Sequence, residues 1–126
     1  MAVPRIRVAV VDDDMSVRKA LRRLLNVASF DIGVYSSGTE FLESLASFQP
    51  QCVILDVHMP VLNGIDVQRR LYAIKSRIPV IVITGHDSTK ARAESLALGA
   101  SAYFIKPIAA EALIAAIRNA TMAKTA

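Results

Sequence analysis

The chain has 126 residues, of which 53% are hydrophobic and 21% charged, and its net charge is +4. This length fits one domain, and the composition excludes disordered, collagen-like and low-complexity proteins. The apolar runs are far shorter than the roughly 20 residues of a membrane-spanning helix. Cys52 is the only cysteine, which suits a reducing cytoplasm. We therefore expect a cytoplasmic protein with a single domain over residues 1–126, in which residues 121–126 form a tail or the start of a linker.

Five short runs rich in β-branched residues alternate with segments of helical periodicity. The runs cover residues 6–11, 32–35, 52–55, 80–84 and 102–105. Between residues 17 and 28, apolar residues recur every three or four positions, which predicts an amphipathic helix. Gly99 is a typical residue for ending the fourth helix. The fifth helix is expected from about residue 109 to residue 123.

Polar residues mark where the middle helices are expected to begin. Ser37 and Glu40 have the spacing of a capping box, in which each side chain accepts a hydrogen bond from a free backbone N–H group. Asn63 is the expected cap of the third helix, and either Asp87 or Ser88 caps the fourth. The sequence thus predicts five successive β-α units.

This alternation predicts an α/β protein with a parallel sheet covered by helices on both faces. Right-handed crossovers leave few topologies, and the strand order 2-1-3-4-5 is the commonest for five units. We therefore expect a doubly wound, five-stranded parallel sheet in this order.

Polar residues also follow the predicted strands at their carboxyl ends, where open α/β sheets bind ligands. Three aspartates (residues 12–14) follow the first strand, Asp56 the third, Thr84 the fourth and Lys106 the fifth. Carboxylates brought together in this way repel one another, and a hard cation with oxygen ligands relieves the repulsion. The sequence therefore predicts a Mg²⁺ site at this edge of the sheet.

Four motifs stand at these strand ends. They are residues 10–14 (VVDDD), residues 54–60 (ILDVHMP) with Gly64, residues 83–85 (ITG) and residues 106–107 (KP). In this order and at these spacings they resemble the receiver domain of two-component response regulators (CheY-like), over essentially the whole chain. Thr84-Gly85-His86 is most similar to the FixJ-like branch, whose members usually carry a helix-turn-helix domain after the receiver. The resemblance implies a flavodoxin-like fold.

The resemblance also implies the roles of the acidic residues. Asp56 would be the phosphoacceptor. Asp13 and Asp56 would bind Mg²⁺ directly, together with the backbone carbonyl of His58. Asp12 would act on the metal through a bound water molecule.

Further roles around the phosphoryl group follow from the same resemblance. Lys106 would pair with Asp56 before phosphorylation and with a phosphoryl oxygen afterwards. Thr84 would donate its hydroxyl to the phosphoryl group, and Tyr103 matches the aromatic switch position of the family. The peptide bond before Pro107 would be cis.

The only two histidines are His58, two residues after Asp56, and His86, two residues after Thr84. We expect their imidazoles to flank the path by which water reaches the acyl phosphate. Because histidine ordinarily titrates near pH 6.5, the lifetime of the phosphorylated state should then depend on pH between roughly 6 and 8. The alternative is that both are solvated loop residues without kinetic effect.

The resemblance implies a phosphorylation-dependent switch rather than an enzyme with an external substrate. A sensor histidine kinase would donate the phosphoryl group, and the surface formed by the fourth helix, fifth strand and fifth helix would change and could form a homodimer. An alternative is a phosphatase or phosphotransferase of the haloacid-dehalogenase type, whose Asp-x-Asp motif would place an acid where this chain has His58. A purely structural interaction module is a third reading, weakened because every phosphorylation residue is present.

The net positive charge of the chain raises the question of nucleic acid binding. Arg18, Lys19, Arg22 and Arg23 lie on one predicted helix, without interleaved aromatic residues or zinc-finger spacing. This pattern favours a solvated helix face. We therefore expect contact with DNA only through an effector domain outside this chain, and no contact with a membrane.

Overall fold

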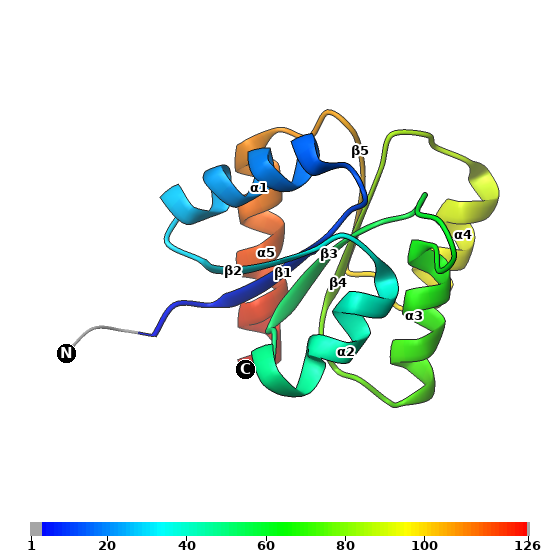
Figure 1. Cartoon of the computed structure of the whole chain (residues 1–126), viewed down its shortest axis with the longest axis horizontal. Coiled ribbons are helices and arrows are strands. Elements are labelled where there is room, and N and C mark those ends of the chain that lie inside the picture. Colours follow the sequence, from blue (N-terminus) through cyan, green and yellow to red (C-terminus); the bar gives the residue numbers. More distant parts are fainter. Residues whose placement is uncertain (1–3, 126) are drawn as a thin grey trace.

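The computed structural model describes residues 4–125, and the ends of the predicted domain, residues 1–3 and 126, lie outside the described part. Strands and helices alternate from β1 to α5 (Figure 1). The strands are β1 (Arg7–Val11), β2 (Asp31–Tyr35), β3 (Cys52–Asp56), β4 (Val80–Thr84) and β5 (Ala102–Ile105). The helices are α1 (Met15–Val27), α2 (Gly38–Phe48), α3 (Gly64–Ala73), α4 (Thr89–Ala97) and α5 (Ala110–Thr125). Each strand lies within one residue of its predicted bounds.

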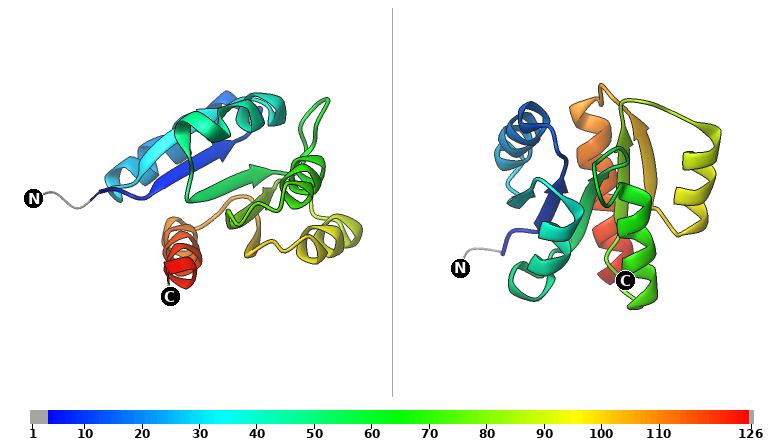
Figure 2. Two further views of the ribbon diagram at one scale, coloured as in Figure 1. Left: turned by 90° about the horizontal axis from the view of Figure 1, so that it is seen from below. Right: turned by 45° about the vertical axis from the view of Figure 1, so that its right-hand side comes forward.

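All four strand pairings are parallel, and the order β2-β1-β3-β4-β5 confirms the predicted topology. Helices α1 and α5 pack against one face of the sheet, and α2, α3 and α4 against the other (Figures 1 and 2). Because all the strands are parallel, their carboxyl ends lie at one edge of the sheet and their amino ends at the opposite edge.

The central strands are buried on both faces, as expected for a sheet covered by helices. Every residue of β3 and β4 is buried, whereas the edge strands β2 and β5 are partly exposed. Alternate residues of β3 point to opposite faces: Leu55 packs in the cluster beneath α2, α3 and α4, and Ile54 in the cluster beneath α1 and α5. Burial raises the pKa of the Cys52 thiol to about 12, so Cys52 is a small apolar side chain rather than a nucleophile.

The predicted capping box of α2 forms only in part. The Ser37 hydroxyl accepts a hydrogen bond from the backbone N–H of Glu40 at 3.1 Å, as expected. The Glu40 carboxylate, however, accepts from the backbone N–H of Ser36 rather than that of Ser37. A complete capping box occurs instead at α3, where Asn63 and Asp66 satisfy each other's backbone N–H groups.

The boundaries of α4 and α5 can be compared with those predicted from the sequence. Ser88, and not Asp87, caps α4 by accepting from the backbone N–H of Ala91, and Gly99 follows the helix with a φ of 92°. Helix α5 runs from Ala110 to Thr125, two residues beyond its predicted end at about residue 123, and so includes most of the segment expected to be a tail or the start of a linker. Thr121, in the last turns of this helix, is buried. Within the described part of the chain, no helix is long and apolar enough to span a bilayer.

Candidate functional site

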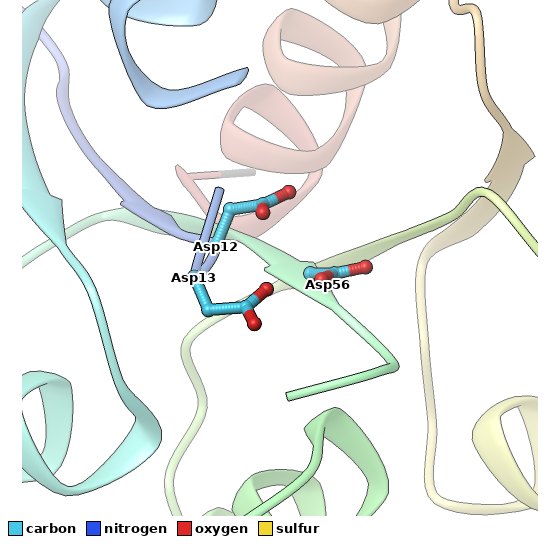
Figure 3. A group of neighbouring side chains, drawn as sticks. All are labelled: Asp12, Asp13 and Asp56. Carbon is cyan, nitrogen blue, oxygen red and sulfur yellow. The ribbon is translucent and has the colours of Figure 1, made fainter. Parts of the chain in front are cut away.

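Three aspartates meet at the carboxyl edge of the sheet. Asp12 and Asp13 follow β1, and Asp56 is the last residue of the neighbouring strand β3 (Figure 3). Each offers a carboxylate oxygen within 4.8 Å of the others. Asp12 and Asp56 are 0% and 4% exposed, whereas Asp13 is exposed. The strand register therefore brings the three carboxylates together, as the sequence predicted, and two of them are buried while the third is exposed.

The loop after β3 is held close to the strand by Gly64, the first residue of α3. Its backbone N–H donates to the carbonyl of Val57 at 2.8 Å. A Cβ at this position would collide with the carbonyl oxygen of Asp56 and lie 2.9 Å from Cα of Val57. Glycine at position 64 thus permits α3 to begin directly against the residue that carries the buried carboxylate.

Lys106, just beyond β5, supplies the cation of the site. Its Nζ lies 2.9 Å from Oδ2 of Asp12 and 3.5 Å from Oδ1 of Asp56. Burial alone would lower the pKa of this ammonium, but the hydrogen bonds and charges of Asp12 and Asp56 outweigh it, so the pKa is raised. The resemblance implied pairing with Asp56, and the structure shows that Asp12 is the nearer partner. The peptide bond from Lys106 to Pro107 is cis.

The Asp56 carboxyl holds its proton more tightly than an ordinary aspartic acid. Burial and the neighbouring charge of Asp12 raise its pKa to about 6, with a smaller contribution from Asp13, while Lys106 acts in the opposite direction. The cluster thus carries more negative charge than its single ammonium can balance. A bound divalent cation would relieve that imbalance.

The two other aspartates differ in how their oxygens are engaged. Asp12 accepts from the backbone N–H of Asp14 through Oδ1 and from Lys106 through Oδ2, both at 2.9 Å. Asp13 has no hydrogen bond or ion pair within residues 4–125. Arg18 adds a contact that the sequence did not predict, donating from Nη1 to the backbone carbonyl of Asp12 at 2.8 Å. Of Asp12 and Asp13, it is therefore Asp13 whose carboxylate oxygens are available to bind a metal.

A second group of contacts joins the loops after β3 and β4. Thr84 is fully buried, and its hydroxyl donates to the backbone carbonyl of His86 at 3.0 Å. The same carbonyl accepts from Nε2 of His58 at 3.1 Å, and the two imidazole rings lie 5.9 Å apart, edge to face. The structure thus brings the two histidines together, and Thr84 donates to a loop carbonyl rather than toward the aspartates.

Tyr103 lies on β5 and makes its polar contacts with the α4 region. Its hydroxyl donates to Oδ1 of Asp87 at 3.0 Å, and the guanidinium carbon of Arg92 lies 4.8 Å from the ring centroid. Nη2 of Arg92 is 3.7 Å from Oδ2 of Asp87. The sequence considered Asp87 only as a helix cap and did not single out Arg92, because contacts between β5 and the start of α4 depend on tertiary packing, which leaves no periodic signal.

Comparisons with known proteins agree with this arrangement. The family model of the response regulator receiver domain matches residues 8–118, so the chain belongs to the response regulator receiver domain family. The response regulator MprA of Mycolicibacterium vanbaalenii is 41% identical over 113 residues, which cover 90% of this chain and 49% of that protein. The chain therefore spans about half the length of the curated relatives it matches.

Solved structures show the same fold. A response regulator receiver domain protein from Clostridium thermocellum superposes with a TM-score of 0.89 at 30% identity, covering 95% of this chain and 97% of that one. The structure titled FixJ-N gives a TM-score of 0.87 at 31% identity, covering 95% and 96%. Phosphorylation on an aspartate is the general function of the family. Receiver domains typically bind Mg²⁺ at an acidic cluster and receive the phosphoryl group from a histidine kinase.

Proposed function

We propose that this chain is a two-component receiver switch whose phosphoacceptor is Asp56 and whose donor is a sensor histidine kinase. The supporting observation is the position of Asp56. Its carboxylate stands at the buried end of β3, beside Asp12 and Asp13, with an ammonium 3.5 Å away. Asp12 shares this burial and this cation, but both of its carboxylate oxygens are engaged, by the backbone N–H of Asp14 and by Lys106, whereas Asp56 contacts Lys106 through Oδ1 alone among the described residues. We further propose that residues 1–126 make up one receiver domain that acts in the cytoplasm.

In the phosphoryl transfer, Asp56 acts as the nucleophile. A carboxylate oxygen of Asp56 forms a bond to phosphorus while the nitrogen–phosphorus bond to the kinase histidine breaks, and the departing imidazole takes up a proton. With a pKa of about 6, Asp56 is mostly ionised at neutral pH. Lys106 is held where its charge stabilises the phosphoryl oxygens, which is the main contribution a protein makes to phosphoryl transfer.

The residues present fit Mg²⁺, because the cluster offers only hard oxygen donors and an excess of negative charge. We propose that Asp13, Asp56 and the backbone carbonyl of His58 hold the ion. Asp12 would contribute through a water molecule, which is consistent with both of its carboxylate oxygens being engaged by Asp14 and Lys106. When bound, Mg²⁺ neutralises charge on the phosphoryl oxygens.

The switch would begin at Thr84. Its hydroxyl must release the carbonyl of His86 before it can donate to a phosphoryl oxygen. This change would alter the loop that carries Asp87 and so the hydrogen bond from Tyr103. We propose that the two states differ in the surface formed by α4, β5 and α5, and that this surface forms a homodimer after phosphorylation. Sedimentation with and without beryllofluoride measures the change, and an unchanged mass with unchanged amide shifts over residues 91–103 would contradict it.

A phosphatase of the haloacid-dehalogenase type remains the competing function. His58 occupies the position of the second acid, and its Nε2 is engaged by the carbonyl of His86. We therefore propose that the chain turns over no external phosphomonoester. Incubation with p-nitrophenyl phosphate and Mg²⁺ should release no product beyond background, and multiple turnovers would favour the phosphatase.

The phosphoacceptor assignment is tested by intact-mass measurement after incubation with acetyl phosphate and Mg²⁺. The wild type should gain one phosphoryl group, and Asp56→Asn should gain none. Asp14→Asn is a matched control, because Asp14 is an exposed carboxylate that caps α1 and asparagine is an equally good cap. Equal labelling of wild type and Asp56→Asn would overturn the assignment.

A further inference from the structure

A second charged region lies away from the aspartates, at the amino end of the sheet. Its five cations line two hollows of about 390 and 290 Å³ that share Phe30. We name it the basic surface, and its cations are Arg5, Lys19, Arg22, Arg23 and Arg118. Figure 1 shows how the pieces meet: the last turns of α1, the start of β2 and the chain before β1 lie on the same side of the molecule.

The basic surface accounts for the net charge of the whole chain. The residues lining its two hollows include five of the 15 lysines and arginines and one of the 11 acidic residues, Asp31. Ten cations and ten carboxylates are left for the rest of the chain. The excess positive charge is therefore concentrated in one place instead of being spread over the protein.

None of these cations forms an ion pair with an acidic residue of the described part of the chain, although Asp31 lines one of the hollows. The lysines and arginines that form ion pairs within residues 4–125 are Arg69, Arg92 and Lys106, and none of them lies on the basic surface. Helix α1 itself contains four cations and no acidic residue. Lys19 stands three and four positions before Arg22 and Arg23, a spacing at which like charges repel and destabilise a helix. An anionic ligand would relieve this repulsion.

The chemistry of the hollows favours a phosphate backbone over an acidic protein. Protein interfaces are usually centred on exposed aromatic or apolar anchors. The aromatic ring common to the two hollows, Phe30, is only 2% exposed, and the guanidinium of Arg118 lies over it, 5.3 Å from the ring centroid. Arginine-rich surfaces suit phosphate oxygens, which guanidinium groups bind through paired hydrogen bonds.

We propose that the basic surface binds the phosphate backbone of double-stranded nucleic acid without reading its sequence. This goes beyond the proposed function, because the surface lies at the edge of the sheet opposite Asp56. The sequence alone favoured a solvated helix face for the cations of α1. The structure leads to a different interpretation, because it places Arg5 and Arg118, from distant parts of the chain, beside these cations.

The test is a fluorescence anisotropy titration of a labelled, mixed-sequence DNA duplex at several salt concentrations. The wild type should bind, with affinity falling as salt rises. Arg22→Ala/Arg23→Ala should weaken binding by about ten-fold at low salt and reduce the salt slope by about two, one for each lost phosphate contact. Arg70→Ala/Lys90→Ala is the matched control, since it removes two exposed cations elsewhere and should change the affinity by less than about two-fold.

Three results would overturn the proposal. Undetectable binding at low salt would exclude a phosphate-backbone site, and equal losses in the two double variants would show that only net charge matters. Tighter binding to phosphatidylserine vesicles than to the duplex would assign the surface to a membrane instead. Asp56→Asn should bind the duplex like the wild type, so the result does not depend on which residue is phosphorylated.

Discussion

The two edges of the sheet carry opposite charges in opposite environments. At the carboxyl edge, Asp12 and Asp56 are almost fully buried, and Lys106 lies within 3.5 Å of both. At the amino edge, the cations of the basic surface are exposed and form no ion pair within residues 4–125. Burial shifts the pKa of Asp56 to about 6, whereas exposed charges are screened by water and salt. The comparison teaches that burial, more than the number of charges, decides where electrostatics affects stability.

The largest effect is expected from removing the buried charge of Asp56. The pKa of this residue is about 6 in the folded protein and about 4 in the unfolded chain. The folded state therefore binds more protons between these values, and the free energy of unfolding falls as the pH rises from about 4 to about 7. Without Mg²⁺, Asp56→Asn should exceed the wild type in stability by about 2–3 kcal/mol at pH 7.

Urea unfolding followed by circular dichroism measures this difference, since the chain has no tryptophan to report by fluorescence. At pH 4 or below, where Asp56 is protonated in the folded state, the two proteins should be nearly equally stable. A stability gap that stays constant over the whole pH range would contradict the role given to burial.

The next effect is expected from Lys106→Ala. The ammonium lies 2.9 Å from the fully buried Asp12 carboxylate, and its loss leaves two buried carboxylates without a cation. We expect the variant to lose about 2 kcal/mol at pH 7 in the absence of Mg²⁺. Added Mg²⁺ should restore more stability to this variant than to the wild type. Lys90→Ala removes an exposed lysine as a control. An equal loss of stability in this variant would contradict the role given to burial.

A smaller, kinetic effect is expected from the histidines. His58 donates to the carbonyl of His86, which also accepts from Thr84, so both imidazoles belong to the loops after β3 and β4, beside the proposed phosphoacceptor. The dephosphorylation rate of the wild type should vary with pH between roughly 6 and 8, and that of His58→Ala/His86→Ala should vary less. Parallel profiles for the two proteins would show that the histidines are bystanders.

The smallest effect on stability is expected at the amino edge. Arg22→Ala/Arg23→Ala removes two exposed cations that have neighbours of the same charge. Its free energy of unfolding should stay within about 0.5 kcal/mol of the wild type, because surface substitutions of this kind rarely do more. The same urea titration measures it. If the free energy of unfolding fell as much as in Lys106→Ala, burial would not explain the difference in electrostatic effect between the two edges.

The sequence predicted the fold well because it depends on patterns that the chain repeats. The β-branched runs, the periodic helices and the caps at Asn63 and Ser88 all lie where the structure has them. The acidic cluster followed from the same reasoning, since parallel strands place their carboxyl ends together. Helix α5 ends two residues beyond its predicted end at about residue 123, and the burial of Thr121 depends on tertiary contacts that periodicity does not record.

The side-chain contacts around the cluster could not be predicted in this way. Two examples are the hydrogen bond from Thr84 to the carbonyl of His86 and the one from Arg18 to the carbonyl of Asp12. Both depend on loop conformations and side-chain rotamers, which residue spacing does not record. The contact of Tyr103 with Asp87 is of the same kind. The sequence could therefore identify residues that share an edge of the sheet, but not the partners that each selects.

The close approach of α3 to β3 has a genetic consequence. Glycine and alanine codons differ by one nucleotide, and Gly64→Ala would count as a conservative change in most sequence comparisons. Yet the added methyl group would meet the backbone of Asp56 and Val57, which has no flexible end to move aside. The strand end would have to shift, and the carboxylate with it. We expect a selection for loss of signalling to recover Gly64→Ala among its alleles, although residue 64 has no reactive group of its own.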